Sequence, residues 1–123
     1  MIKKNINKPW GYEYLIEVNK NFMFKKLFMK KNHRCSLQYH NKKTESVFVL
    51  KGKLRVVIKK NKKLKNVILK ANDNILIKKK TIHRMEAVSD CIYLEASTPE
   101  INDVIRLEDD YRRVVLLDKK NNI

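Results

Sequence analysis

The residues with the clearest chemistry lie in one short stretch, residues 35–45, and at one later histidine. Alternate residues of a β-strand face the same side, so Gln38 and His40 are predicted to project together. A turn after His40 would bring Glu45, at the start of the next strand, back to the same point, and His83 begins a later strand. Amide, imidazole and carboxylate ligands suit Zn²⁺, Mn²⁺, Fe²⁺, Co²⁺ or Ni²⁺ and leave positions open for water or substrate. The spacing therefore predicts a divalent-metal site with nitrogen and oxygen ligands.

Each of these residues also has a structural alternative. Gln38 and Glu45 could be polar residues at strand edges, and His40 and His83 could be ordinary core or surface histidines. His33 has the opposite strand parity from His40 and is predicted to lie at the surface. A structural zinc site is usually built from four Cys or from Cys and His, and the spacing of this chain cannot assemble one.

The elements that must position these residues are predicted to be strands. Apolar and polar residues alternate over Leu54–Ile58, and the apolar run Ser46–Leu50 ends at Lys51 and Gly52, which is a hairpin signal. Many short strands at close spacing predict an all-β sandwich or barrel. Helical spacing is found only over Pro99–Asp110, where a short C-terminal helix is expected. The other predicted strands are Tyr12–Glu17, Phe22–Met29, Cys35–His40, Val67–Lys70, Asn74–Lys78, His83–Val88 and Cys91–Glu95.

The turns between these strands contain asparagine where glycine is usual, because the chain has only 2 glycines. Asn and Asp tolerate positive φ best among the remaining residue types. We therefore predict positive φ at four asparagines, Asn32, Asn61, Asn72 and Asn74.

Length and composition limit the classes of protein to which this chain can belong. A chain of 123 residues without a repeat or linker is expected to be one domain, from Met1 to Ile123. The hydrophobic fraction of 43% is ordinary despite a net charge of +16, which excludes a disordered chain. No apolar run approaches the roughly 20 residues of a membrane span, and the N-terminus lacks the apolar core of a signal peptide. We expect a soluble, cytoplasmic protein whose two cysteines, Cys35 and Cys91, are reduced and buried.

The large positive charge raises the hypothesis of nucleic-acid binding. The excess is mostly Lys, however, and it is scattered along the chain together with abundant Asn and Ile, a pattern that A/T-rich codons explain. No recognition helix, RNP-like aromatic motif or zinc-finger spacing accompanies it. We therefore expect neither nucleic acid nor membrane as a specific partner.

Taken together, these motifs resemble those of a known family. The pattern Gln38-x-His40-x4-Glu45-x6-Gly52, followed by Thr81-Ile82-His83-Arg84, resembles the two motifs of the cupin superfamily, small β-barrels that hold a metal inside. The opening Lys8-Pro9-Trp10-Gly11 and the tail Ser97–Asp109 are similar to mannose-6-phosphate isomerases. In the type II branch of these enzymes, a cupin often forms the C-terminal part of a mannose-1-phosphate guanylyltransferase. The resemblance extends from about Lys8 to Arg113 and implies a single cupin barrel.

The resemblance also implies roles for individual residues. The metal ligands would be Gln38, His40, Glu45 and His83. The catalytic residues would be Lys43 and Arg106, and Ser36 would bind the substrate. Arg84 is expected as a second substrate-binding residue, because its positive charge lies beside His83, where an anionic sugar would sit. The family's usual motif glycines are replaced by Asn32, Asn72 and Lys80, and its proline by Lys78.

On this resemblance we expect a metal-dependent isomerase, with Zn²⁺ as the first choice of ion, that interconverts mannose 6-phosphate and fructose 6-phosphate. Lys43 or a metal-bound hydroxide would move the proton between C1 and C2, and Arg106 would stabilise the oxyanion. The structural alternatives are a solvated turn lysine at position 43 and an ion pair of Arg106 with Asp109 or Asp110.

The alternative function is a non-catalytic cupin that binds a sugar or nucleotide-sugar beside a separate guanylyltransferase. The expected partners are a small sugar phosphate and a second copy of the chain, in a homodimer that pairs through strands.

Overall fold

The computed structural model describes residues 4–113, and within this range the chain forms strands and no helix. All of the predicted strands are present with shifted ends, and β1 and β11 are additional. The all-β prediction is therefore confirmed. Residues 4–113 include no helix long and apolar enough to cross a membrane. The strands are β1 Lys4–Lys8, β2 Gly11–Val18, β3 Met23–Met29, β4 Leu37–Tyr39, β5 Glu45–Lys51, β6 Leu54–Lys60, β7 Lys63–Leu69, β8 Asn74–Ile77, β9 His83–Ala87, β10 Cys91–Ser97 and β11 Ile105–Glu108.

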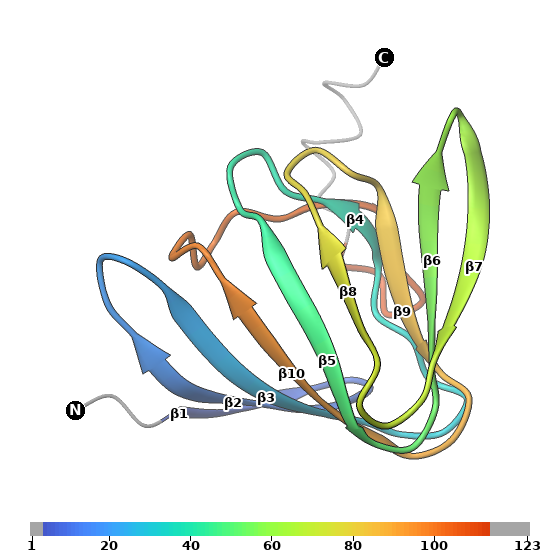
Figure 1. Cartoon of the computed structure of the whole chain (residues 1–123), viewed down its shortest axis with the longest axis horizontal. Helices are drawn as coiled ribbons and strands as arrows, with labels where there is room; N and C mark the ends of the chain where they lie inside the picture. Colours follow the sequence, from blue (N-terminus) through green and yellow to red (C-terminus); the bar gives the residue numbers. More distant parts are fainter. Residues whose placement is uncertain (1–3, 114–123) are drawn as a thin grey trace.

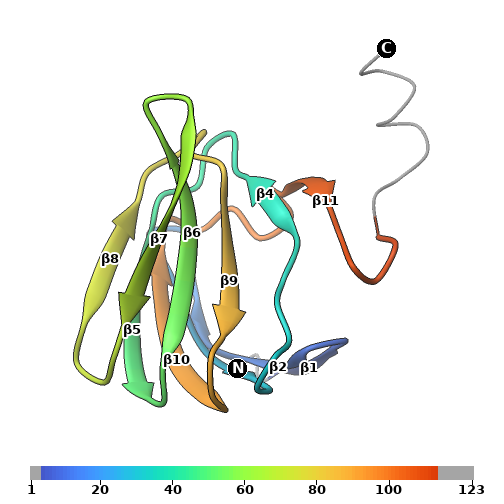
Figure 2. The same cartoon turned by 90° about the vertical axis from the view of Figure 1, so that its right-hand side faces the viewer.

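The strands form two antiparallel sheets that face each other. One sheet has six strands in the order β1-β2-β3-β10-β5-β8, and the other has five in the order β11-β4-β9-β6-β7. In Figure 1, β4, β9, β6 and β7 all lie on one side of the six-stranded sheet. Figure 2 shows β11 beside β4 at the outer edge of the five-stranded sheet. Because consecutive strands such as β4 and β5 belong to different sheets, residues at the end of one strand and the start of the next meet across the interior.

The core lies between the two sheets and follows the two-residue period of the strands. In β3, β5 and β10 every second residue is buried, and the residues between them face outward. Cys35 and Cys91 belong to this core as free thiols, as expected. The largest fully buried side chains include Tyr93, Met23, Met29, Leu54, Ile77 and Met85.

Three of the four asparagines predicted to adopt a positive φ do so. The φ angles of Asn32, Asn61 and Asn72 are 66°, 51° and 76°. Lys80, which replaces a family glycine, also has a positive φ of 66°, so the backbone keeps the glycine conformation without the glycine. The prediction for Asn74 is wrong, because this residue lies within β8 and pairs with Phe48.

The C-terminal helix expected over Pro99–Asp110 is not present in these residues. This segment contains a turn and then β11, which pairs antiparallel with β4 so that Arg106 lies opposite Gln38. The apolar residues that suggested a helix face different surroundings: Ile101, which is 53% exposed, and Val104 line a cavity, and Ile105 lies in the strand. Pairing with the edge of β4 satisfies the backbone polar groups that a helix would have satisfied internally, so tertiary context overrides the local pattern.

Candidate metal centre

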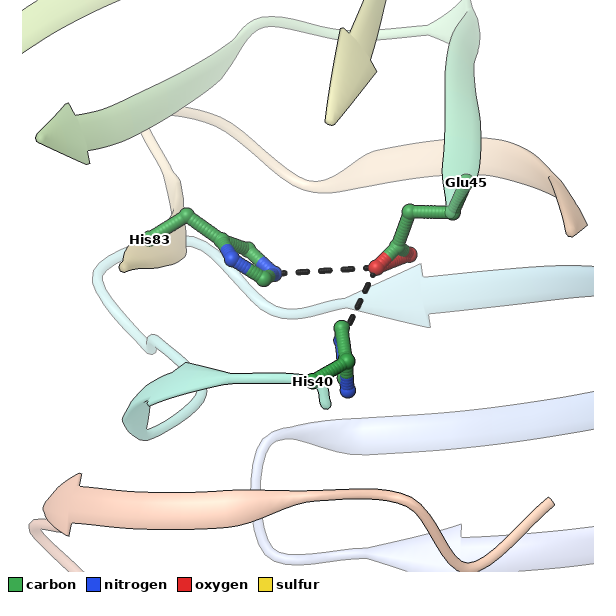
Figure 3. A group of neighbouring side chains, drawn as sticks. All are labelled: His40, Glu45 and His83. Atoms are coloured by element: carbon green, nitrogen blue, oxygen red, sulfur yellow. Dashed lines mark hydrogen bonds and ion pairs between the residues drawn. The ribbon is translucent and has the colours of Figure 1, made fainter. Parts of the chain in front are cut away.

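Three of the predicted ligands converge between the sheets. His40 follows β4, Glu45 begins β5 and His83 begins β9, so three strands deliver one side chain each. Glu45 lies between the two imidazoles, with its Oε2 3.0 Å from Nε2 of His40 and 3.6 Å from Nε2 of His83 (Figure 3). One ligand atom from each residue lies within 4.8 Å of the others, and all three residues are buried. The group is therefore compact enough to hold a metal ion.

The hydrogen bonds on the far side of each ring decide which nitrogen faces Glu45. Nδ1 of His40 lies 2.5 Å from the carbonyl oxygen of Asp103, and Nδ1 of His83 lies 2.8 Å from that of Thr81. A carbonyl oxygen only accepts, so each Nδ1 donates a hydrogen and a neutral ring presents the lone pair of Nε2.

Two lone pairs therefore point at a carboxylate oxygen, which is also an acceptor. Nε2 of His83 is buried and has no hydrogen-bond partner among residues 4–113. Three buried acceptors that face one another repel unless a cation lies between them. Ligands at about 2.1 Å from one ion lie roughly 3.0–3.4 Å apart, close to the separations found here, so the residues fit a divalent metal.

Gln38, the fourth predicted ligand, lies beside this group. It pairs with His83 in the ladder between β4 and β9 and lines the same cavity as His40 and Glu45. Its Oε1 accepts a hydrogen bond of 2.6 Å from the hydroxyl of Ser36. An amide oxygen has two lone pairs, so this bond leaves one available to an ion.

A cavity of about 110 Å³ lies beside His40 and Glu45, and Lys43 and Arg106 line it. The Lys43 side chain is buried rather than solvated, with a residue exposure of 6%. Arg106 pairs with neither alternative acid, because Asp109 binds Arg113 and Asp110 binds Arg34. Burial and the charge of Arg113 lower the pKa of Arg106, and within the described part of the chain its buried Nε has no hydrogen-bond partner.

The structure does not bring the two predicted substrate-binding residues to the cavity wall. Arg84 is buried, and its Nε and Nη2 donate to the carbonyl oxygens of Cys35, at 2.9 Å, and Glu108, at 3.3 Å. Its guanidinium thus ties β9 to the chain before β4 and to β11. Ser36 is buried and binds Gln38, which places it behind a predicted ligand.

The sequence analysis missed six charged or polar residues of the cavity wall: Lys8, Trp10, Glu13, Lys25, Glu95 and Arg113. Lys25 forms an ion pair of 2.9 Å with Glu13. Burial, with the nearby charge of Glu45, raises the pKa of Glu95 to about 8. Lys25 and Glu95 occupy inward-facing positions of β3 and β10. A charged residue at a position where the strand alternation predicts a buried apolar side chain was the signal that could have revealed them.

Asp103, also missed, holds the chain between the metal ligands. Its carboxylate accepts hydrogen bonds from the backbone N–H groups of Asn41, Lys42 and Lys43, at 2.9, 2.7 and 2.9 Å. This loop joins His40 to Glu45, and the Asp103 carbonyl fixes the His40 ring. One residue of the C-terminal segment therefore orients both a ligand and the loop that bears Lys43.

Comparison with known proteins identifies the family. Residues 1–113 match the family model described as "Mannose-6-phosphate isomerase C-terminal". The chain belongs to this family. A curated relative, the mannose-1-phosphate guanylyltransferase ManC of Salmonella typhimurium, is 30% identical over 116 residues. The alignment covers 90% of this chain and only 23% of ManC, so the family domain found here spans about a quarter of that relative.

Solved structures show that this family domain has the cupin fold. It matches the capsular polysaccharide assembling protein CapF of Staphylococcus aureus with a TM-score of 0.76 at 13% identity, covering 88% of this chain and 32% of CapF. It matches the oxalate decarboxylase of Bacillus subtilis with a TM-score of 0.79 at 16% identity, covering 98% of this chain and 34% of that one. An RmlC-like cupin from Shewanella frigidimarina gives 0.69 at 16% identity, with coverages of 81% and 86%. The predicted cupin fold is confirmed.

Proposed function

We propose that this cupin domain is a divalent-metal-dependent sugar-phosphate isomerase of the aldose–ketose type, acting on mannose 6-phosphate or a close relative. The observation that supports it most is the convergence of the acceptor atoms of His40, Glu45 and His83 beside a cavity lined by Lys43 and Arg106. Gln38 is the proposed fourth ligand, and Zn²⁺ is the first choice among the ions that this donor set accepts. The barrel over residues 8–113 is proposed to act as one domain.

The charges of the cavity wall favour an anionic ligand. Five cationic residues line it, Lys8, Lys25, Lys43, Arg106 and Arg113, against the three acids Glu13, Glu45 and Glu95. Two buried N–H groups, Nε1 of Trp10 and Nε of Arg106, have no hydrogen-bond partner among the residues that the structure describes. Buried donors without partners are costly, and the oxygens of a phosphorylated sugar could satisfy them.

The proposed roles of the residues follow from their positions. A bound ion would act as a Lewis acid that polarises the sugar oxygens. Lys43, held in the cavity by the loop that Asp103 fixes, would carry the proton between C1 and C2. Arg106 would donate to the oxygen that becomes negative during the transfer.

A turnover assay with added metals tests the proposal. The purified protein, loaded in turn with Zn²⁺, Mn²⁺, Fe²⁺, Co²⁺ and Ni²⁺, is assayed for conversion of mannose 6-phosphate to fructose 6-phosphate. We expect metal-dependent turnover that Arg106→Ala reduces by at least about 100-fold. Arg55→Ala is the matched control, because Arg55 pairs with Glu86 away from the cavity. A folded, metal-loaded protein that turns over nothing refutes the isomerase.

The second candidate is a binding module that acts with a guanylyltransferase, and it is favoured by the ManC relative, of which this domain matches 23%. Binding measurements on the same variants separate the two. An inactive parent that binds a sugar phosphate or nucleotide-sugar supports the module, whereas Arg106→Ala that binds but does not turn over supports the enzyme. The name of CapF, a capsular polysaccharide assembling protein, is consistent with a role in polysaccharide biosynthesis for either function. We also propose a cytoplasmic location.

A further inference from the structure

Exposed lysines gather at one end of the barrel. The tip of the β6–β7 hairpin, the β4–β5 connection and the β8–β9 connection all lie at this end (Figure 1, Figure 2). Backbone hydrogen bonds join the three segments: the N–H of Lys59 donates to the carbonyl oxygen of Ile82 at 2.9 Å, and that of Lys80 donates to His40 at 2.6 Å. Eight exposed lysines on these segments form what we call the basic rim: Lys42, Lys59, Lys60, Lys62, Lys63, Lys78, Lys79 and Lys80.

Acidic residues are scarce in the part of the sequence that supplies most of the rim. Residues 46–85 contain 13 Lys and Arg and one acid, Asp73, so this third of the chain carries +12 of the net charge of +16. Asp73 lies in the turn between β7 and β8, at the opposite end of the barrel (Figure 1). The lysines of that opposite end have acids among them, since Asp73 and Asp90 accept hydrogen bonds from the backbone N–H groups of Lys70 and Lys31. The two ends therefore differ in how far their lysines are balanced by acids.

The positive charge of the basic rim is not neutralised by the described part of the chain. None of its eight lysines forms an ion pair with an acid among residues 4–113. Two acids lie nearby, but the Asp103 carboxylate accepts from backbone N–H groups of the β4–β5 connection, and Oε1 of Glu100 accepts from the hydroxyl of Thr98 at 2.7 Å. Even when both acids are counted, the rim keeps an excess of six positive charges. It is therefore a surface that attracts polyanions.

The side chains of the rim favour a lipid surface over a nucleic acid. Its cations are all lysines, which act as point charges and suit a layer of many phosphates better than bidentate binding of a single one. The three segments, residues 41–44, 59–65 and 78–82, contain no aromatic residue on which a base could stack. Leu64 is instead 53% exposed and lies opposite Lys59 in the hairpin, whose tip projects farthest at this end (Figure 1, Figure 2). An apolar side chain among lysines suits the headgroup layer of a membrane, where leucine enters the apolar boundary and lysines contact phosphates.

We propose that the basic rim docks this domain on the surface of an anionic phospholipid membrane, with the tip of the β6–β7 hairpin toward the bilayer. Sequence order alone predicts no membrane partner, because it does not show that segments some 20 residues apart place their lysines at one end of the barrel. The contact is peripheral: residues 4–113 include no membrane-spanning helix. No lysine of the rim lines the cavity beside the candidate metal centre, so the inference does not depend on the proposed activity.

Co-sedimentation of the full chain with lipid vesicles tests the proposal. We expect binding to phosphatidylcholine vesicles that contain about 30% phosphatidylglycerol, and none to pure phosphatidylcholine. The combined variant Lys60→Gln, Lys63→Gln, Lys78→Gln and Lys79→Gln should bind at least roughly 100-fold more weakly, because each lysine near an anionic surface contributes about fivefold. The matched control removes four exposed lysines at the opposite end of the barrel and should change binding by roughly threefold at most, since salt screens charges beyond about 10 Å. Its substitutions are Lys30→Gln, Lys31→Gln, Lys51→Gln and Lys53→Gln.

A second pair of variants separates a membrane from other polyanions. Leu64→Ser leaves the charge unchanged and should weaken vesicle binding roughly fivefold, because a buried leucine is lost from the contact. Ile68→Ser is its control, since Ile68 is 42% exposed on the same strand but lies four residues farther from the tip. Circular dichroism checks that each variant is folded. The proposal is overturned if anionic vesicles do not bind, if pure phosphatidylcholine binds as well, or if the two sets of lysine substitutions act alike. Double-stranded DNA that binds more tightly than anionic vesicles at equal phosphate concentration assigns the rim to nucleic acid and also overturns it.

Discussion

Glu95 is a buried carboxyl group whose protonation should govern how stability depends on pH. Its exposure is 9%, and burial with the nearby Glu45 charge raises its pKa from 4.5 to about 8. Between these two pH values the folded protein keeps this proton while the unfolded chain releases it. The unfolded state then binds fewer protons, so the group makes the free energy of unfolding fall as pH rises.

The expected size of this effect follows from the shift. Each pH unit between 4.5 and 8 costs about 1.4 kcal/mol, which amounts to about 3 kcal/mol at pH 7. Glu95→Gln replaces the carboxyl with a neutral group of the same shape and removes the penalty. We therefore expect the variant to match the wild type near pH 4.5 and to be more stable by about 3 kcal/mol at pH 7.

Urea denaturation of the metal-free protein in EDTA, at pH steps from 5 to 8, measures this difference. The comparison between variant and wild type cancels the titration of groups that both share. Glu17→Gln serves as the control for the substitution itself, because Glu17 is exposed. A difference for Glu95→Gln that is flat with pH, or that makes the variant less stable at pH 7, refutes the reasoning.

Three other predictions follow from single contacts. Asp103→Ala should weaken Co²⁺ binding roughly 10–100-fold in a spectroscopic titration, because it removes the hydrogen bonds that hold the loop between His40 and Glu45. Asp73→Ala is the control: it loses a contact to Lys70 in a different turn and should leave Co²⁺ binding unchanged. Gly52→Ala should lower thermal stability by about 1–3 kcal/mol, since φ at this position is 87°; an unchanged melting temperature would contradict this. Burial raises the pKa of the Cys35 thiol to about 12, so a thiol reagent at pH 8 should label it only after denaturation, and rapid labelling of the folded protein would show that the core is open.

The local pattern of the sequence was enough to predict most of the strands. Alternation over Leu54–Ile58 and the glycine hairpin after Leu50 depend on interactions between neighbours in the chain, and they reappear as β6 and its turn. Asn32, Asn61 and Asn72 likewise adopt the positive φ that their types favour. The helix expected at Pro99–Asp110 does not form because the strand that pairs with this segment, β4, lies nearly seventy residues earlier in the chain, and no local pattern contains that partner.

The residues of the candidate site were likewise predicted only in part from the sequence. Residue types and spacing in the sequence alone identified His40, Glu45 and His83 as a group that could bind a divalent ion, and the structure brings these three together. Sequence could not place Arg84 against the carbonyl of Cys35 rather than in the cavity, nor could it show that Lys25, Glu95 and Asp103 surround the site. Those positions depend on which sheet each strand joins and on what lies across the interior from it. Burial, pKa and the choice of hydrogen-bond partner are set by such long-range neighbours, so only the tertiary structure decided them.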